Sequence, residues 1–142
     1  MKISTKGRYA LRVMIDLAGH DAGAVISLRD ISQRQGITLK YLEQITPLLS
    51  RAGLLKSIRG SSGGYRLTRP AAEYTAGEIL RAVEGSLVPV ACLEDEPNCC
   101  TRCNDCKTLP FWQGLAQIID DYVDGVTLED LLRGAPFLPE SL

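Results

Sequence analysis

ISLRDISQRQGITLKYLEQ, residues 26–44, is the stretch that decides the fold, and IRGSSGGYRL, residues 58–67, completes it. Ser27 predicts the N-cap of a short helix over 28–35. Gly36 supplies a tight turn, and Thr38 begins another helix that runs through residue 45. A helix, a short glycine-containing turn and a second helix form the helix-turn-helix arrangement.

The second half of the stretch predicts a β-hairpin. Residues 54–58 and 65–68 suit two short strands, and Arg59-Gly60-Ser61-Ser62-Gly63-Gly64 forms the loop between them. A glycine-rich loop can instead cradle a nucleotide phosphate, but the Lys-Ser/Thr pair and following helix of a P-loop are missing. A hairpin directly after a helix-turn-helix is a wing, so residues 1–86 are expected to form a winged helix-turn-helix module.

Working outward, the apolar spacing predicts further helices over 5–19, from 75 to about 85, over 109–123 and around 128–132. Capping boxes are expected at three helix starts, Ser27/Asp30, Thr75/Glu78 and Thr127/Asp130. Pro47 should kink the third helix or divide it near Ile45. The predicted class is mainly α with a small β wing. A cysteine-rich loop spans 87–108, a long dimerisation helix and a short helix span 109–134, and a loose tail spans 135–142.

The two halves of the chain carry opposite charge. Residues 1–70 hold twelve Lys and Arg against four acids, a net charge of +8, whereas residues 71–142 have a net charge of −9. Such asymmetry indicates a basic module for a polyanion, which the whole-chain charge of −1 conceals. Double-stranded DNA is the expected partner. The residues predicted to contact it are Thr38, Lys40, Tyr41, Glu43 and Gln44 on the second helix of the motif, and Arg59 and Gly60 in the wing.

All five cysteines fall within fifteen residues, at Cys92, Cys99, Cys100, Cys103 and Cys106. Disulfides that stabilise a fold usually close long loops, whereas a tight cluster of soft thiolates favours zinc, copper(I) or an iron–sulfur cluster. A redox thiol switch and a structural disulfide remain as alternatives. The N-terminus lacks the layout of a signal peptide and no apolar run could span a membrane, so a reducing, cytoplasmic location is expected.

These residues resemble a known family. STKGRYALRVMIDLA, YLEQI followed by RGSSGGYRL, and YTAGEILRAVEG are similar to the IscR-type family of small bacterial winged-helix regulators, whose relatives include the nitric-oxide sensor NsrR and the cysteine-metabolism repressor CymR. The likeness is close over residues 1–86 and looser beyond. It implies a cytoplasmic homodimer that binds near-palindromic promoter DNA through two helix-turn-helix units.

The resemblance also implies a cofactor. IscR-like members ligate a 2Fe–2S cluster through three cysteines after the wing and a following histidine, and Cys92, Cys100 and Cys106 match that trio best. Leu109 stands where the histidine would be. Cys103 or Cys99 is therefore expected as a further ligand, and a 4Fe–4S cluster remains an alternative. CymR-like members lack these cysteines and respond to a partner enzyme.

Three classes of function follow. The favoured class is a transcriptional regulator, a repressor, whose promoter binding is modulated by an iron–sulfur cluster and which controls cluster-assembly genes. The alternative is a regulator of the same fold without a cluster, such as a cysteine-metabolism repressor acting with a partner enzyme, or a nitric-oxide or redox sensor. No constellation of His, Asp and Ser supports an enzyme, and neither a membrane nor a small-molecule substrate is expected as partner.

Overall fold

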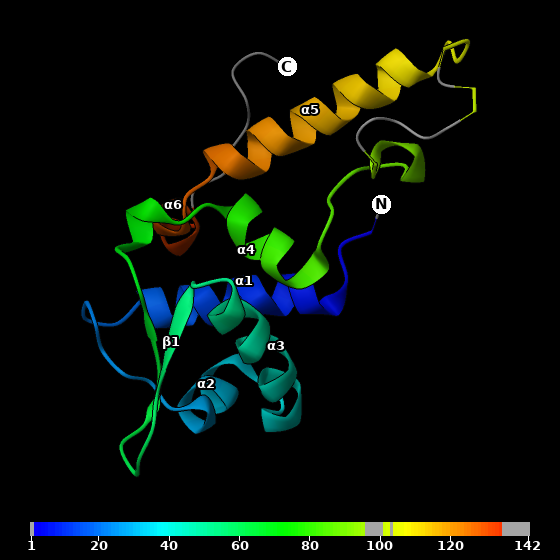
Figure 1. The fold of residues 1–142 in the computed structure, drawn as a ribbon. Helices are drawn as coiled ribbons and strands as arrows, with labels where there is room; N and C mark the ends of the chain where they lie inside the picture. Colours follow the sequence, from blue (N-terminus) through cyan, green and yellow to red (C-terminus); the bar gives the residue numbers. More distant parts are fainter. Residues whose placement is uncertain (1, 96–100, 103, 135–142) are drawn as a thin grey trace.

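The computed structural model describes residues 2–95, 101–102 and 104–134. In chain order the elements are α1 (Thr5–Ala18), α2 (Leu28–Gln35), α3 (Leu39–Arg51), β1 (Leu55–Ile58), β2 (Gly64–Leu67), the 3-10 turn η1 (Ala71–Glu73), α4 (Ala76–Glu84), the 3-10 turn η2 (Ala91–Leu93), α5 (Leu109–Gly125) and α6 (Leu128–Arg133). Figure 1 shows the predicted class, mainly helical with one small antiparallel hairpin.

Local capping chemistry sets the helix-turn-helix. The hydroxyl of Ser27 accepts from the backbone N–H of Asp30 (3.1 Å), and that of Thr38 accepts from the N–H of Tyr41 (3.2 Å). Gly36 ends α2 in the left-handed region, with φ of 65°, a conformation that costs glycine little. The predicted turn is therefore confirmed.

The three expected capping boxes form to different extents. Thr127 and Asp130 make both reciprocal bonds at the start of α6, each 3.0 Å long. At α4 the hydroxyl of Thr75 accepts from the N–H of Glu78 (3.1 Å). The Glu78 carboxylate pairs with Arg69 (2.7 Å) instead of accepting from the backbone N–H of Thr75. Within the described residues, α2 also carries only the serine half of its box.

Of the two effects expected at Pro47, a kink or a division near Ile45, the division is wrong, because α3 continues through Pro47 to Arg51. Proline removes one helical N–H, which leaves the carbonyl of Glu43 without its usual partner. Glu43 is exposed, so water can satisfy that carbonyl. One residue earlier, the buried Thr46 hydroxyl donates to the carbonyl of Leu42 (2.9 Å), which adds a bond on the core side of the helix.

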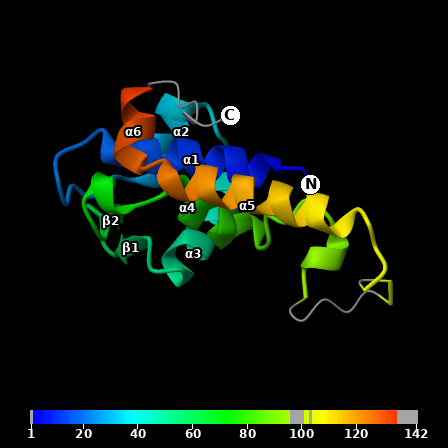
Figure 2. The same cartoon turned by 90° about the horizontal axis from the view of Figure 1, so that it is seen from above.

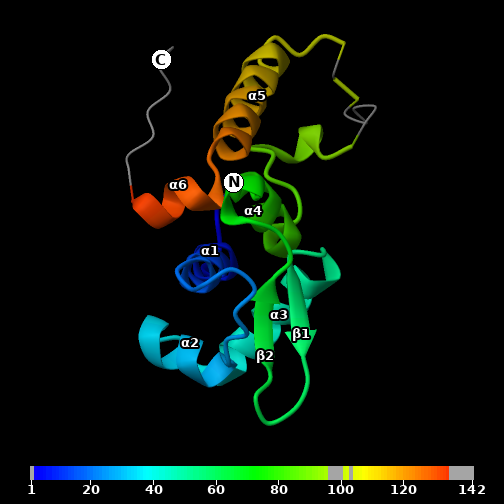
Figure 3. The same ribbon diagram turned by 90° about the vertical axis from the view of Figure 1, so that its left-hand side faces the viewer.

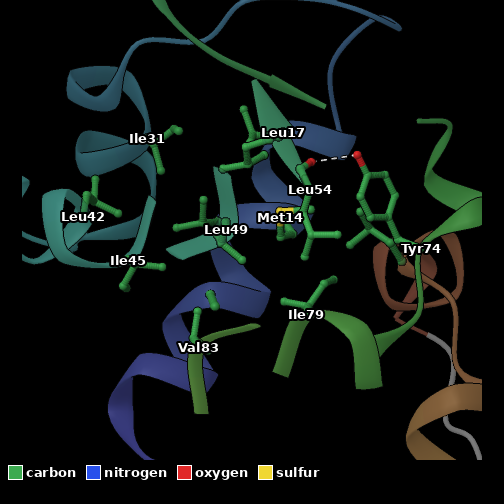
Figure 4. Packing of buried hydrophobic residues seen from close by; sticks show 14 of the residues in the cluster. Met14, Leu17, Ile31, Leu42, Ile45, Leu49, Leu54, Tyr74, Ile79 and Val83 are labelled. Carbon is green, nitrogen blue, oxygen red and sulfur yellow. Dashed lines mark hydrogen bonds between the residues drawn. The ribbon is translucent and has the colours of Figure 1, made fainter. Parts of the chain in front are cut away.

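The core lies where α1 crosses the motif and α4. Helix α1 packs against α2, α3, α4, α6 and β2, which makes it the central element of the fold (Figures 1 and 3). Figure 4 shows side chains from four helices and the intervening segments converging, namely Met14, Leu17, Ile31, Leu42, Ile45, Leu49, Leu54, Tyr74, Ile79 and Val83. Burial of these apolar side chains is the main source of stability for the module.

An isolated β-bridge joins the hairpin to the rest of the module. Leu55 lies opposite Leu67 and Ile58 opposite Gly64 in the antiparallel ladder. Ile26 then pairs with Tyr65 through two backbone hydrogen bonds of 2.9 and 2.8 Å. A Cβ at Gly64 would collide with the carbonyl of Ile26, so this close approach requires glycine.

Helix α5 runs over α4 (Figure 2), and one guanidinium of α4 forms ion pairs with it. Arg81 of α4 pairs with Asp120 (2.7 Å) and Asp124 (2.6 Å) of α5. A Cβ at Gly77 would collide with the carboxylate of Asp124, so the small residue permits this approach. In the described part of the chain, no helix is long and apolar enough to cross a membrane.

Candidate nucleic-acid interface and cysteine segment

The predicted DNA contacts gather at one end of the molecule. In Figures 1 and 3, α2, α3 and the tip of the hairpin lie at the end opposite to α5. On α3, Lys40, Glu43 and Gln44 are exposed, because the helix buries its other side through Leu42 and Ile45. The structure thus presents three polar side chains of α3 to solvent.

Thr38 and Tyr41 already have structural tasks. The Thr38 hydroxyl caps α3, as described above. Tyr41 is half-buried and meets the ring of Tyr9 on α1 edge-to-face, with 5.3 Å between ring centroids. Arg12 lies over the Tyr9 ring at 5.3 Å and donates to the side-chain oxygen (3.2 Å) and the backbone carbonyl of Gln35. Tyr41 therefore helps to set the angle of α3 against α1.

A buried carboxylate on α1 fixes the position of α2 against α1. Asp16 of α1 accepts two hydrogen bonds from Arg34 (2.8 and 3.0 Å) and one from the side chain of Gln35 (3.0 Å). Burial alone would raise the pKa of Asp16, but the hydrogen bonds from Arg34 and Gln35 and the charge of Arg34 outweigh it, so the pKa lies below its usual value of 3.8. The helix-turn-helix is thus braced by charge as well as by apolar contact.

The wing presents its cation at the predicted place. Arg59 is exposed and directly follows β1. Gly60 then turns the chain with φ of 113°, and its carbonyl accepts from the N–H of Gly63 (3.0 Å). A residue with a side chain would be strained at this φ, which explains glycine at position 60.

The wing carries two further cations that were not predicted from the sequence as DNA contacts. Lys56 and Arg66 stand directly opposite each other in the ladder. Like charges in this position repel, which destabilises a hairpin unless a polyanion neutralises them. The signal that could have found them is their equal distance, three residues, from the loop 59–63, since hairpin pairing follows from that spacing.

Two of the five cysteines lie in the described part of the chain. Cys92 lies in η2 and Cys106 just before α5; both are half-buried free thiols. The thiol of Cys106 lies 3.3 Å from the Thr108 hydroxyl, and hydrogen bonding from Thr108 lowers its pKa, which favours the thiolate that binds metals. Cys99, Cys100 and Cys103 lie outside the described residues, which by themselves contain no group of three metal-ligating side chains.

The only histidine, His20, lies exposed at the end of α1, where its Nδ1 is 2.8 Å from the carbonyl oxygen of Asp16. Leu109, which occupies the position of the expected histidine ligand, is the first residue of α5.

A helix-turn-helix with a basic wing defines a class of DNA-binding protein, and comparisons with known proteins identify the family. The model of the Rrf2 family, described as an iron-dependent transcriptional regulator, matches residues 3–134. The chain belongs to the Rrf2 family of transcriptional regulators.

Relatives agree along nearly the whole chain. The protein Rrf2 of Nitratidesulfovibrio vulgaris is 38% identical over 141 residues, which cover 99% of this chain and 93% of the relative. The regulator IscR of Aliivibrio salmonicida is 40% identical over 132 residues, covering 93% and 77% of the two chains. These relatives are regulators and not enzymes, as expected from the sequence.

Solved structures give the same answer for the fold. The structure of CymR, described as the global cysteine regulator of B. subtilis, has a TM-score of 0.78 at 39% identity, covering 96% of this chain and 99% of its own. IscR of T. potens has a TM-score of 0.74 at 37% identity, covering 96% and 89%. The winged-helix regulator fold is therefore confirmed.

Proposed function

We propose that this regulator binds near-palindromic promoter DNA as a homodimer and represses transcription. Helix α3 enters the major groove with Lys40, Glu43 and Gln44 exposed for base edges or phosphates. The wing contacts the flank, where Arg59 binds a phosphate or enters the minor groove. Thr38, Tyr41 and Gly60 position these elements.

The observation that carries this proposal is the concentration of exposed cations at one end of the fold. Lys40 on α3 and Lys56 and Arg59 in the hairpin are all exposed. The opposed pair Lys56 and Arg66 has no ion-pair partner among the described residues, so a polyanion would relieve their repulsion. The phosphate backbone of DNA supplies such charge.

The homodimer is supported by the uncovered face of α5. Phe111 is 64% exposed, Ile118 50% and Tyr122 42%. Ile118 and Tyr122 also line an apolar groove with Ile3, Leu80 and Leu87. Burying this face against a second copy removes apolar area from water. Two copies related by a twofold axis would present two α3 helices to half-sites about one helical turn apart.

The experiment measures the affinity of the full-length chain for promoter duplexes at several salt concentrations. Arg59→Ala should weaken binding by about 1–3 kcal/mol if the side chain touches a base, or flatten the salt dependence by about one unit if it touches phosphate. Arg133→Ala on α6, an equal change of charge far from the wing, is the matched control. Equal binding of both variants and wild type at every salt concentration contradicts the wing contact.

We further propose that an iron–sulfur cluster, 2Fe–2S rather than 4Fe–4S, modulates DNA binding and that the targets include genes of cluster assembly. The donor set fits, because Cys92 and Cys106 are unpaired, accessible thiols on either side of the remaining cysteines. Cys92, Cys100 and Cys106 would hold the cluster, with Cys103 or Cys99 as a further ligand. A bound cluster supplies reversible redox and ligand-exchange chemistry, through which a signal can reach the protein.

The test is the visible spectrum and the iron and sulfide content of protein purified without oxygen. Thiolate-to-iron absorbance with stoichiometric iron and sulfide supports the cluster. Protein that is colourless and still binds its promoter with full affinity contradicts the cluster. That result favours the alternative, a regulator without a cluster that acts with a partner enzyme in cysteine metabolism or senses nitric oxide or redox state. The likeness to CymR supports this alternative.

A further inference from the structure

The side chain of Tyr74 is fully buried, yet its hydroxyl makes the bonds that close the base of the wing. It donates to the carbonyl of Leu54 (2.8 Å), directly before β1, and accepts from the N–H groups of Thr68 (2.8 Å) and Arg69 (3.1 Å), directly after β2. Figure 4 shows the Tyr74 ring beside the core with its hydroxyl aimed at Leu54. One oxygen atom therefore joins the entry of the hairpin to its exit.

Arg69 and Thr68, which flank the Tyr74 hydroxyl, make further contacts at the base of the wing. The guanidinium of Arg69 lies 4.3 Å from the ring centroid and pairs with Glu78 of α4 at 2.7 Å. The Thr68 hydroxyl donates to the carbonyl of Gly53 (2.8 Å), one residue before Leu54. The base of the wing is thus tied to α4 by charge and to the end of α3 by hydrogen bonds.

The backbone of Tyr74 faces a different element. Its carbonyl accepts from the N–H of Leu128 (3.0 Å), and two residues on, the N–H of Ala76 donates to the carbonyl of Val126 (2.8 Å). Thr75 and Thr127 form an isolated β-bridge between these bonds. Tyr74 therefore contacts the wing with its side chain and the joint between α5 and α6 with its backbone.

We propose that Tyr74 is a positioning residue for DNA binding, which holds the wing at the angle at which Arg59 meets DNA and couples that angle to the end of α5. Beyond these contacts at its base, the hairpin is joined to the module by the bridge of Ile26 with Tyr65, near its middle. Loss of the Tyr74 hydroxyl removes three of the hydrogen bonds that hold the base, so the hairpin can pivot about that bridge and its tip can move. This inference rests on the wing contact proposed above.

The first test follows the wing without DNA. Tyr74→Phe keeps the ring and removes the hydroxyl, and amide hydrogen exchange over residues 55–67 should accelerate by about fivefold or more. Val83→Ala, a buried truncation on α4 away from the wing, is the control for lost stability. Exchange in the wing that is unchanged, or that rises equally in the control, overturns the proposal.

The second test uses DNA affinity in a double-mutant cycle. Tyr74→Phe should weaken binding about 3- to 10-fold, as expected for lost ordering hydrogen bonds, and should have little further effect when Arg59 is already Ala. The same loss with and without Arg59 overturns the positioning role. If Arg59→Ala alone changes nothing, the wing contact has failed instead, and hydrogen exchange alone decides whether Tyr74 holds the wing.

Discussion

One carboxylate oxygen of Glu84, on α4, accepts hydrogen bonds from both the backbone N–H (2.8 Å) and the hydroxyl (2.6 Å) of Ser4, the N-cap of α1. The same oxygen accepts from the N–H of Gly7 at 3.0 Å. A negative charge at a helix N-terminus is favourable, because unpaired N–H groups and the positive end of the helix dipole meet there. Helix α4 therefore caps the central helix of the module.

We expect Glu84→Gln to lower the free energy of unfolding by about 1–2 kcal/mol, since the charge is lost while the shape remains. Urea unfolding at neutral pH measures this loss. Glu73→Gln, at an exposed acid in η1, is the matched control and should change stability little. Equal stabilities of the two variants would contradict the capping role.

Gly7 gives a second, independent check of the same contact. A Cβ at this position would lie 2.5 Å from the Glu84 oxygen and 2.7 Å from Cγ2 of Ile3. Gly7→Ala should therefore destabilise the wild type despite the better helix propensity of alanine. The cost should be smaller when Glu84 is also Ala, because the nearest atom is then absent. Purely additive losses in this cycle would show that the two residues do not interact.

The Asp16–Arg34 pair predicts how stability depends on acid. Because the native pKa of Asp16 lies below 3.8, the unfolded chain binds more protons between the two values, and the free energy of unfolding rises with pH there. This stability is fully present above pH 3.8 and is lost as pH falls through the native pKa. Asp16→Asn should cost about 1–3 kcal/mol at pH 7 and less in acid.

Unfolding of wild type, Asp16→Asn and Asp21→Asn across this pH range measures the effect. Asp21 is an exposed acid in the loop after α1 and serves as control. A stability difference between wild type and Asp16→Asn that stays constant down to the lowest pH would contradict the linkage.

Glu43 is expected to restrict which promoters are bound. It is an exposed carboxylate on α3 that can accept from a cytosine amino group, but at other bases it is left as an unpaired charge near phosphates. Glu43→Ala should broaden the range of sites, with changes of about 1–3 kcal/mol at the affected base pairs. A panel of base-substituted duplexes measures this, and an identical ranking for mutant and wild type would refute it.

The cysteines are expected to contribute unequally to the visible spectrum. Cys92→Ala and Cys106→Ala should each abolish it, whereas Cys99→Ala should leave it largely intact. Cys103→Ala should change the spectrum or the lifetime of the cluster in oxygen if Cys103 is the further ligand. It should change neither property if a carboxylate is the further ligand instead. Iron and sulfide assays on each variant make the comparison quantitative. Full iron and sulfide content in Cys92→Ala would show that the assigned ligand set is wrong.

The parts of the fold predictable from sequence were those governed by local chemistry. The starts of α2, α3 and α6 follow from Ser27, Thr38 and Thr127, because a cap bonds to a backbone group only two or three residues away. Gly36 marks the turn for a similar reason. The wing follows from two short strands around one glycine-rich loop, since the two strands of a hairpin are neighbours in sequence.

Several of the missed contacts join segments that are separated in sequence. Glu84 and Ser4 are 80 residues apart, and nothing in the local pattern of either distinguishes a capping carboxylate from a solvated one. The capping box expected at α4 forms only in part, because the Glu78 carboxylate pairs with Arg69, which lies outside the helix. Tyr74 resembled an ordinary core residue, because the amide groups that its hydroxyl binds carry no sequence signal. The ligand roles of Cys92, Cys100 and Cys106 remain predictions.

The position of the Arg81 ion pairs along α5 has a mechanical consequence. Helix α5 has 17 residues, so it is about 25 Å long, and Arg81 grips it through Asp120 and Asp124 near its C-terminal end. Its first turns extend beyond α4 (Figure 1), and Cys106 lies three residues before its first residue, Leu109. The arm from these ion pairs to Leu109 is about 20 Å, so a tilt of about 10° there displaces the far end by about 3 Å. Conversely, a displacement of that size beside Cys106 reaches Arg81 and the Val126–Ala76 bond as a small rotation, with the force multiplied.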